Sequence, residues 1–227
     1  MIDIKVNRFP IILLANYRTG GSALAIHLAQ KYNIKYFSEP FQNIRVHIFD
    51  QHKKDYVSLI LRENTSNFLV KFAPIQISEL NNYEKMMNCS SFKIRLNRKN
   101  KVDQIVSLYI AEQRDKFFKL KQESSEKYSI PIHMDELCLV ATVILRNDFL
   151  LRTLPYTYDL DLTYEDLGFI ENTDHVLSDQ PENIEEIREE VRRILQLKWE
   201  YIEKNLNKKG KEIALFPYLE TGALRQN

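Results

Sequence analysis

A short loop near the amino terminus combines residue types that bind phosphate groups. In the stretch "ANYRTGGSAL", residues 15–24, Gly20 and Gly21 permit close approach of a ligand to the backbone, and Ser22 stands where a helix begins. Amide groups at a helix start bind anions with the help of the helix dipole, and Arg18 adds a forked cation. The loop predicts an anion site; the alternative is a strand-to-helix turn whose glycines serve geometry alone.

The same loop departs from the nucleotide-binding loop of kinases. That motif requires a Lys followed by Ser or Thr after its last glycine, to reach the terminal phosphates and to hold magnesium. Here Gly21 is followed by Ser22 and Ala23. We therefore expect an anion that is handled without magnesium, and metal-assisted phosphoryl transfer by a small-molecule kinase is the less favoured alternative.

Further basic groups follow two other predicted strands. Lys71 lies near the end of "NFLVKFAP", residues 67–74, and the basic loop "NRKNK", residues 97–101, follows the alternating segment "SFKIRL". A strand buried on both faces would be apolar throughout, so this alternation indicates that one face meets solvent or a bound anion. The alternatives are an ordinary strand-end lysine and a solvated basic turn.

The order of the elements predicts an α/β fold. Strands are expected at residues 9–15, 67–74, 91–96 and 156–167, and helices at residues 22–32, 101–120, 134–154 and from Pro181 onward. Alternating strands and helices favour a three-layer sandwich with a mainly parallel central sheet. Ligands of such sheets bind beyond the carboxyl ends of the strands, where the first loop and the basic loop would both lie.

Composition and charge narrow the class of protein. Hydrophobic residues make up 44% and charged residues 28% of the 227 residues, a globular balance that fits a single domain over residues 1–227. The chain has 32 basic and 31 acidic side chains, which gives a formal net charge of +1. This balance offers no general attraction to nucleic acid or acidic membranes, so any anion binding must be local.

The apolar runs, cysteines and histidines of the sequence bear on membrane spanning, on the cellular compartment and on metal binding. The longest apolar run near the amino terminus, residues 10–15, is too short to span a bilayer. Cys89 and Cys138 lack metal-ligand spacing and cannot form a disulfide framework, which favours a reducing, cytoplasmic compartment. The five histidines show no metal-binding spacing either, so we expect no metal.

Four segments, in order, resemble the sulfotransferases that use 3′-phosphoadenosine 5′-phosphosulfate (PAPS), above all the bacterial glycolipid and trehalose type. "YRTGGS", residues 17–22, is similar to their 5′-phosphosulfate loop, and "SEPF", residues 38–41, to a Glu-Pro segment. "RLNRKNKVDQIVSLYIA", residues 95–111, resembles the 3′-phosphate segment, and "LTYEDL", residues 162–167, a late Tyr-Glu-Asp-Leu segment. The resemblance implies a P-loop-like phosphosulfate-binding loop on the α/β sandwich.

The resemblance also implies roles for particular residues. Arg98 with Ser107 would bind the 3′-phosphate, with Lys99 as the alternative to Arg98. In this chain Tyr17 replaces the usual Pro and Gly21 a hydroxyl residue, so one side-chain phosphate contact is expected to be missing. The residues that would bind the 5′-phosphosulfate are Arg18, Thr19, Gly20, Gly21 and Ser22.

Sulfuryl transfer needs an aligned acceptor hydroxyl, a base for its proton, and cations that stabilise the leaving phosphate. The cytosolic animal enzymes carry a catalytic His just after a Lys-Thr pair, whereas Lys71 is followed here by Phe72 and Ala73. The similarity to the bacterial Glu-Pro branch therefore makes Glu39 the expected base, with Arg18 and Lys71 as catalytic cations. The alternative for Glu39 is a solvated or helix-capping loop glutamate.

The leading expectation is a PAPS-dependent sulfotransferase that acts on a hydroxyl, such as one on a carbohydrate or glycolipid. The alternative is a non-catalytic nucleotide-binding or interaction module on the same fold, because the first loop is altered and the histidine is missing.

Overall fold

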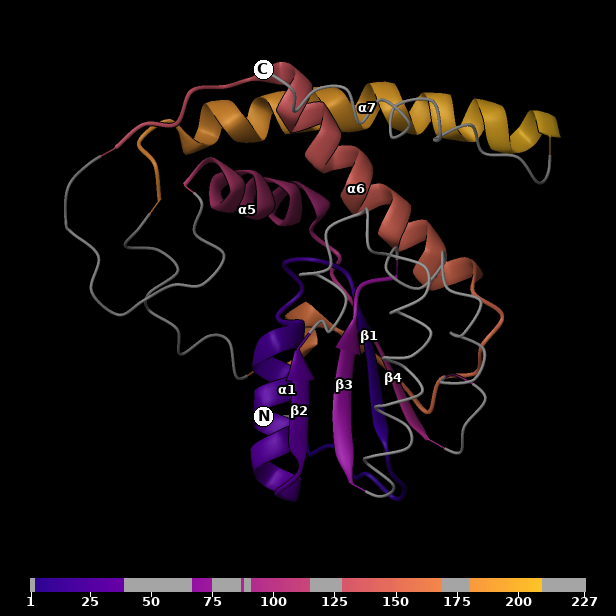
Figure 1. Cartoon of the computed structure of the whole chain (residues 1–227). Helices are drawn as coiled ribbons and strands as arrows, with labels where there is room; N and C mark the ends of the chain where they lie inside the picture. Colours follow the sequence, from indigo (N-terminus) through magenta and orange to yellow (C-terminus); the bar gives the residue numbers. More distant parts are fainter. Residues whose placement is uncertain are drawn as a thin grey trace, which may run out of the picture. The chain divides into compact units, whose positions relative to one another are not determined.

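The computed structural model describes residues 3–38, 67–74, 87, 91–114, 128–168 and 180–209, with only the backbone of residues 38 and 197–209. The chain divides into two compact units (Figure 1). The first unit consists of Met1–Lys99 and Asn147–Asn172, and the second of Asn100–Arg146 and Thr173–Asn227. Each unit is described by itself.

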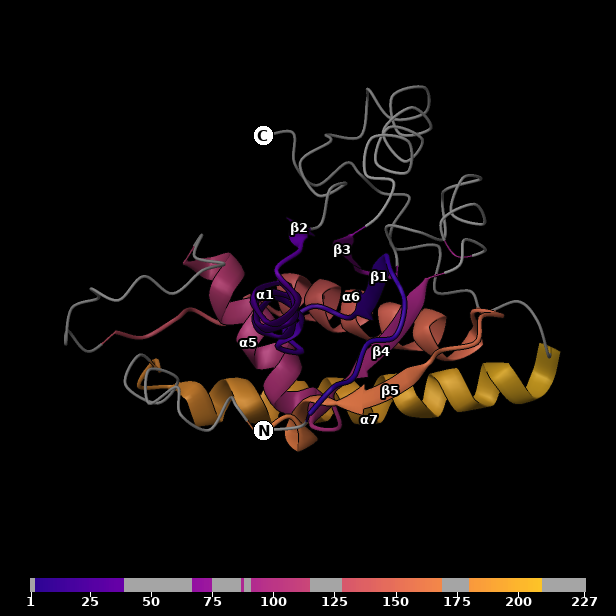
Figure 2. The same cartoon turned by 90° about the horizontal axis from the view of Figure 1, so that it is seen from below.

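The first unit is built on a five-stranded sheet in which every pairing is parallel, as the alternation of elements predicts. The strand order is β2-β3-β1-β4-β5, and it can be followed in Figure 2. The strands are β1 (Ile11–Ala15), β2 (Lys35–Ser38), β3 (Phe68–Phe72), β4 (Phe92–Asn97) and β5 (Leu160–Thr163). The fold is therefore of the predicted α/β class.

The central strand β1 is buried along its whole length, which explains its unbroken apolar sequence "IILLA". Leu14 pairs with Phe72 of β3, and Ala15 pairs with Leu96 of β4. The three central strands consequently end at the same edge of the sheet. The loops that follow β1 and β4 start from this edge.

Apolar side chains cover both faces of the sheet. On one face, Leu24 and Leu28 of α1 (Gly21–Tyr32) belong to a buried cluster with Leu13 of β1. On the other face, Leu14 belongs to a second cluster with Leu151, near the end of α6 (Met134–Thr153). Alternate residues of β1 thus bury opposite sides, which gives the expected helix, sheet and helix layers.

The observed elements differ from the predicted ones in two places of the first unit. The edge strand β2 is absent from the prediction, because its four residues "KYFS" are too few to give a clear pattern. The predicted strand at residues 156–167 is shorter. It reduces to β5 and is followed by a short 3₁₀ helix, η2 (Tyr164–Asp166).

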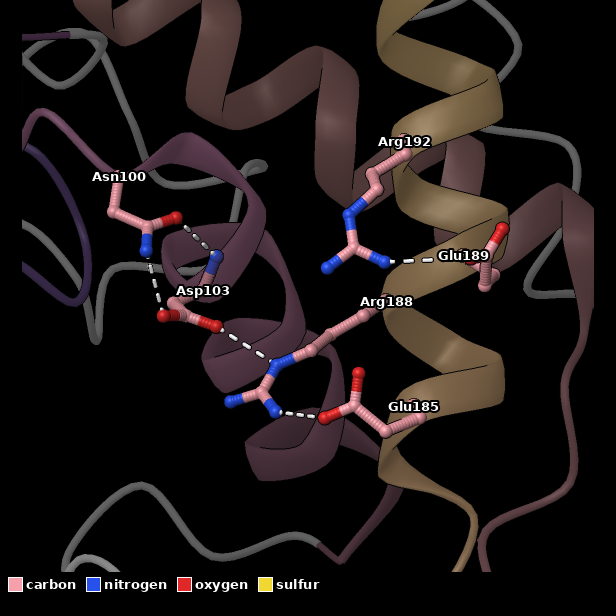
Figure 3. A network of polar contacts seen from close by, with 6 residues as sticks. All are labelled: Asn100, Asp103, Glu185, Arg188, Glu189 and Arg192. Carbon is pink, nitrogen blue, oxygen red and sulfur yellow. Dashed lines mark hydrogen bonds and ion pairs between the residues drawn. The ribbon is translucent and has the colours of Figure 1, made fainter.

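The second unit contains α5 (Lys101–Gln113), α6 up to Arg146, and α7 (Ile184–Lys209). Asn100 caps α5 by accepting a hydrogen bond from the amide of Asp103, 3.0 Å away. Arg188 of α7 donates from Nε to Oδ1 of Asp103 at 3.0 Å and also pairs with Glu185 (Figure 3). This network connects the start of α5 to α7.

The long helix α7 is amphipathic, as predicted from its apolar stripe. Ile187, Val191 and Ile194 are buried, while Arg192 and Arg193 on the other side are exposed. In the described ranges of the chain, no helix has the length and apolar character needed to cross a membrane.

Candidate functional site

The loop between β1 and α1 has an unusual backbone. Gly20, which precedes the helix, has φ of 73°, and Arg18 has φ of 55°. Positive φ is uncommon for a residue with a side chain, and such conformations persist where surrounding contacts enforce them. Gly20 also caps α1 without a side-chain hydrogen bond, so the capping position leaves the first-turn amides of α1 to other partners.

Buried polar side chains hold this loop from inside the protein. Asn16 donates from Nδ2 to Oδ1 of Asp148 at 3.0 Å, and its own Oδ1 accepts from the amide of Tyr17 at 2.8 Å. Thr19 donates from Oγ1 to the carbonyl oxygen of Asn16 at 2.7 Å. Thr19, Asn16 and Asp148 are only 0%, 1% and 4% exposed. The Thr19 hydroxyl therefore supports the shape of the loop.

A lysine from β3 reaches the first turn of α1. Lys71, which is 5% exposed, donates from Nζ to Oγ of Ser22 at 3.0 Å. Gly21 makes room for it: a Cβ atom on Gly21 would lie 3.2 Å from Cε of Lys71 and 2.7 Å from Cβ of Ala15. The start of α1 thus carries an ammonium group although its own loop contains no lysine.

This contact corrects one inference from the sequence. Counted from Ala15, with Gly20 as its last glycine, the loop keeps the spacing of the nucleotide-binding motif G-x-x-x-x-G-K-[ST]. Ser22 then stands at the hydroxyl position and Gly21 at the lysine position. The loop therefore lacks the motif's lysine, as expected, but it keeps the hydroxyl residue, and the ammonium group at this turn comes from Lys71 of β3.

Arg98 follows β4 and lies against the same loop. Its Nη1 donates to the carbonyl oxygen of Arg18 at 2.9 Å, and its guanidinium lies over the ring of Tyr164, 4.5 Å from the centroid. Its Nε is buried and has no hydrogen-bond partner among the described residues. Buried polar groups normally have partners, so an unpaired donor here suits an incoming acceptor.

The two arginines raise the local positive potential. Burial, and then the nearby charge of Arg98, lower the pKa of Arg18, while Tyr164 acts in the opposite direction. An arginine stays charged under these conditions, so the same desolvation and repulsion favour binding of an anion beside it. Arg18 and Arg98 therefore bring two positive charges close together at the loop that precedes α1.

The Tyr-Glu-Asp segment of η2 supports the loop after β4. The carboxylate of Glu165 accepts from the amide of Lys99 at 3.0 and 3.1 Å, and Nζ of Lys99 lies 3.7 Å from Oδ2 of Asp166. Of the two basic residues that the sequence leaves open, Arg98 is thus the one whose side chain contacts the first loop. Lys99 is directed to the acidic segment.

The structure brings together most of the predicted site residues: Arg18, Thr19, Gly20, Gly21, Ser22, Lys71 and Arg98. Ser107 is partly exposed on α5, in the second unit. Glu39 lies outside the described residues. Among the residues that are described, no group of three or more His, Cys, Asp or Glu side chains is placed to hold a metal ion.

Sequence reasoning missed three residues of this site. Asn16 directly follows the buried β1, and a polar residue at that edge is a signal that could have identified it. Tyr164 lay in a recognised segment without an assigned role. Nothing in the sequence marks Asp148 as a buried partner of the loop, because a single acidic residue in a helix is usually exposed to solvent.

Comparisons with known proteins find similarity among solved structures only. No protein-family model matches the chain, and no curated protein matches it. Solved structures with similarity include a shikimate kinase from Bacteroides thetaiotaomicron, with 13% identity, a TM-score of 0.40, and coverage of 83% of this chain and 98% of the kinase. A shikimate kinase from Aquifex aeolicus has 10% identity, a TM-score of 0.38, and coverage of 85% and 98%. A putative kinase from Chloroflexus aurantiacus has 13% identity, a TM-score of 0.36, and coverage of 82% and 99%. At these values the likeness carries no argument about the activity of this chain.

Proposed function

We propose that the protein is a sulfotransferase that moves a sulfuryl group from PAPS to a hydroxyl of an acceptor, such as a carbohydrate or glycolipid. One observation carries this proposal: three cationic side chains cluster at this loop, because Lys71 contacts Ser22 in the first turn of α1 and Arg98 contacts the carbonyl oxygen of Arg18, whose own charge it affects. Such a cluster, at the positive end of a helix, suits a ligand with strongly acidic groups.

The residues present fit the donor's 5′-phosphosulfate. Its oxygens are acceptors, and the start of α1 offers backbone amides, the Ser22 hydroxyl and the Lys71 ammonium as donors. In the proposed role, Arg18 and Lys71 stabilise the charge that develops on the leaving phosphate. PAPS supplies the activated sulfuryl group, and these residues bind and orient it.

We assign the donor's 3′-phosphate to Arg98, while the role of Ser107 in binding the same phosphate stays a prediction from the resemblance. The Nε of Arg98 has no hydrogen-bond partner within the described ranges, and this supports the assignment because a phosphate oxygen would satisfy it. The guanidinium also lies over the ring of Tyr164, and its planar arrangement of donors suits forked binding of a phosphate.

Glu39 is the proposed base that accepts the proton of the acceptor hydroxyl. Ser38, the residue before it, is the register partner of Lys71 at the end of β2. This pairing relates the Glu-Pro segment to the strand that carries Lys71, which supports a common site for the two residues.

The test compares two ligands and then measures turnover. Calorimetry with 3′-phosphoadenosine 5′-phosphate (PAP) and with AMP measures the preference for a 3′-phosphate, and radiolabelled PAPS with hydroxylated acceptors measures transfer. The proposal expects PAP to bind more tightly than AMP, together with acceptor-dependent sulfation. Binding of PAP without turnover on any acceptor would indicate a non-catalytic binding module instead. No preference for PAP over AMP would contradict both.

ATP-dependent phosphoryl transfer to a small hydroxyl compound is a second candidate. The observation that favours it is the spacing of Gly20 and Ser22, completed by the ammonium of Lys71. This candidate expects ATP to bind more tightly in the presence of Mg²⁺ and to bind better than PAP.

A further inference from the structure

We propose that Glu165 is a positioning residue of the anion site: its carboxylate holds the loop after β4, this loop places Arg98, and Arg98 holds the first loop at Arg18. Loss of Glu165 would then weaken the binding of anions, although it removes a negative charge. The inference rests on the proposed function only in that an anionic ligand binds at the first loop.

The strands β4 and β5 end side by side, and Glu165 extends their contact beyond the sheet. Asn97, the last residue of β4, pairs in register with Thr163, the last residue of β5. Two positions after each of these residues, both carboxylate oxygens of Glu165 accept from the amide of Lys99, at 3.0 and 3.1 Å. A hydrogen bond to a charged acceptor is stronger than one between neutral groups. This bond therefore fixes the backbone next to Arg98.

The residue before Glu165 contacts the side chain of Arg98. The guanidinium of Arg98 lies over the ring of Tyr164, 4.5 Å from the centroid, and its Nη1 donates to the carbonyl oxygen of Arg18 at 2.9 Å. Two neighbouring residues of η2 thus hold two neighbouring residues of the loop, because Tyr164 contacts the side chain of Arg98 and Glu165 binds the backbone of Lys99. A shift of the backbone at Lys99 would displace the donor that reaches Arg18.

The first loop needs support from outside because of its backbone conformation. Arg18 has φ of 55°, which costs free energy for a residue with a side chain and persists where contacts enforce it. On the side of β1, the buried hydroxyl of Thr19 donates to the carbonyl oxygen of Asn16 at 2.7 Å. On the side of β4, the bond from Arg98 falls on Arg18 itself. Without the second bond the loop would relax more readily, and its affinity for an anion would fall.

The charge of Glu165 separates this role from a purely electrostatic one. Removing a negative charge near an anion site should strengthen anion binding, though only slightly for an exposed carboxylate that water and salt screen. A positioning role predicts the opposite sign. Asp166 is the matched control, because it is the next residue of η2 and is also exposed, but its carboxylate lies 3.7 Å from Nζ of Lys99.

The experiment measures affinity for PAP and for AMP by calorimetry, with displacement of PAP by AMP for weak binding. The parent is compared with Glu165→Ala, Glu165→Gln, Asp166→Ala and Arg98→Lys. AMP lacks the 3′-phosphate that is assigned to Arg98, so a change in its affinity reports on the first loop. Glu165→Gln keeps an acceptor oxygen without the charge, whereas Arg98→Lys keeps the charge without the fork. Thermal unfolding checks that each variant is folded.

Glu165→Ala should bind both PAP and AMP about three- to tenfold more weakly than the parent, the loss expected for one supporting hydrogen bond. Arg98→Lys should weaken AMP binding by a similar factor, because it loses the bond to Arg18. Glu165→Gln should stay close to the parent. Asp166→Ala should bind both ligands as the parent does, or slightly more tightly. A loss at Glu165 without a loss at Asp166 would identify the positioning role.

Several outcomes would overturn the inference while the proposed function stands. If Glu165→Ala binds PAP as tightly as the parent or more tightly, Glu165 has no positioning role. If its PAP affinity falls but its AMP affinity does not, the effect ends at Arg98 and does not reach the first loop. An equal loss in Asp166→Ala would indicate general damage to η2. Should Glu165→Ala not fold, parent-like AMP affinity of Arg98→Lys would refute the last step by itself.

Failure of the proposed function would give a different result. If the parent binds PAP and AMP equally well, the proposed function is contradicted, while the comparison of Glu165→Ala with Asp166→Ala still decides the role of Glu165. If the parent binds neither ligand, the inference and the proposed function both fail.

Discussion

Arg98 donates a hydrogen bond from its guanidinium to the carbonyl oxygen of Arg18 at 2.9 Å, and this contact connects the loop after β4 to the loop after β1. The bond falls on a residue with positive φ, the conformation that most needs support. Arg98 therefore has two tasks in the proposed site: it shapes the first loop and it offers its remaining donors to a ligand.

Because Arg98 has two roles, we can predict the effect of replacing its guanidinium group by an ammonium group. Arg98→Lys keeps the charge but cannot bind the Arg18 carbonyl and a phosphate in the same way, so PAP affinity should fall about tenfold. Lys99→Met is the control, because Nζ of Lys99 is paired with Asp166. Calorimetry with PAP checks both variants, and a larger loss for Lys99→Met would reverse the assignment of Arg98.

Glu39 can be tested for the role of base without affecting donor binding. Glu39→Gln retains the size of the side chain but cannot accept the proton, so turnover of PAPS should fall by about a hundredfold. Affinity for PAP should not change, since Glu39 is not assigned to the donor. Steady-state rates across pH and calorimetry on the same samples separate the two effects. Parent-like rates at every pH would exclude Glu39 as the base.

Sequence patterns are sufficient to predict those parts of the site whose residues lie close together along the chain. The apolar run of β1 followed by Gly20 and Gly21 predicts a strand, a tight loop and a helix, and all three are present. The alternation in β4 also corresponds to alternating burial. Its partly exposed Arg95 pairs with Asp161 of β5, which gives a structural reason for that charge.

Contacts between distant residues could not be predicted in this way. Lys71 and Ser22 are separated by 49 positions, and Asn16 and Asp148 by 132. Local periodicity carries no information on such pairs, because it reports only which face of an element is buried. The edge strand β2 was not predicted for a different reason: its four residues are too few to show an alternating pattern.

The buried contact between Asp148 and Asn16 should contribute to stability. Asp148→Ala would remove the acceptor of this buried hydrogen bond from Asn16, which should cost about 1–3 kcal/mol of unfolding free energy. Asp148→Asn retains an acceptor oxygen and should lose less. Urea denaturation measures both values. Equal stability of Asp148→Ala and the parent would mean that the loop is held without this bond.

The network of α5 and α7 in Figure 3 allows a comparison on one helix. Arg188 is 23% exposed and binds Asp103 across the two helices, so Arg188→Met should cost about 1 kcal/mol. Arg192 is 49% exposed and lies 3.6 Å from Glu189 on the same helix, so Arg192→Met should cost close to nothing. A double-mutant cycle with Asp103→Asn checks the coupling, and no coupling for Arg188 would contradict the contact.

Tyr158 predicts how stability depends on alkaline pH. Burial raises its pKa to about 12, with Arg95 acting in the opposite direction, from an ordinary value of 10.0. Between these two values the unfolded chain loses the phenolic proton while the folded protein keeps it, so stability should fall as pH rises from about 10 to about 12.

The Tyr158 hydroxyl is buried without a hydrogen-bond partner among the described residues, so Tyr158→Phe should not lower stability at neutral pH. Urea unfolding at a series of pH values should give a smaller alkaline loss for Tyr158→Phe than for the parent, and identical profiles would show that Tyr158 ionises as readily in the folded protein as in the unfolded chain.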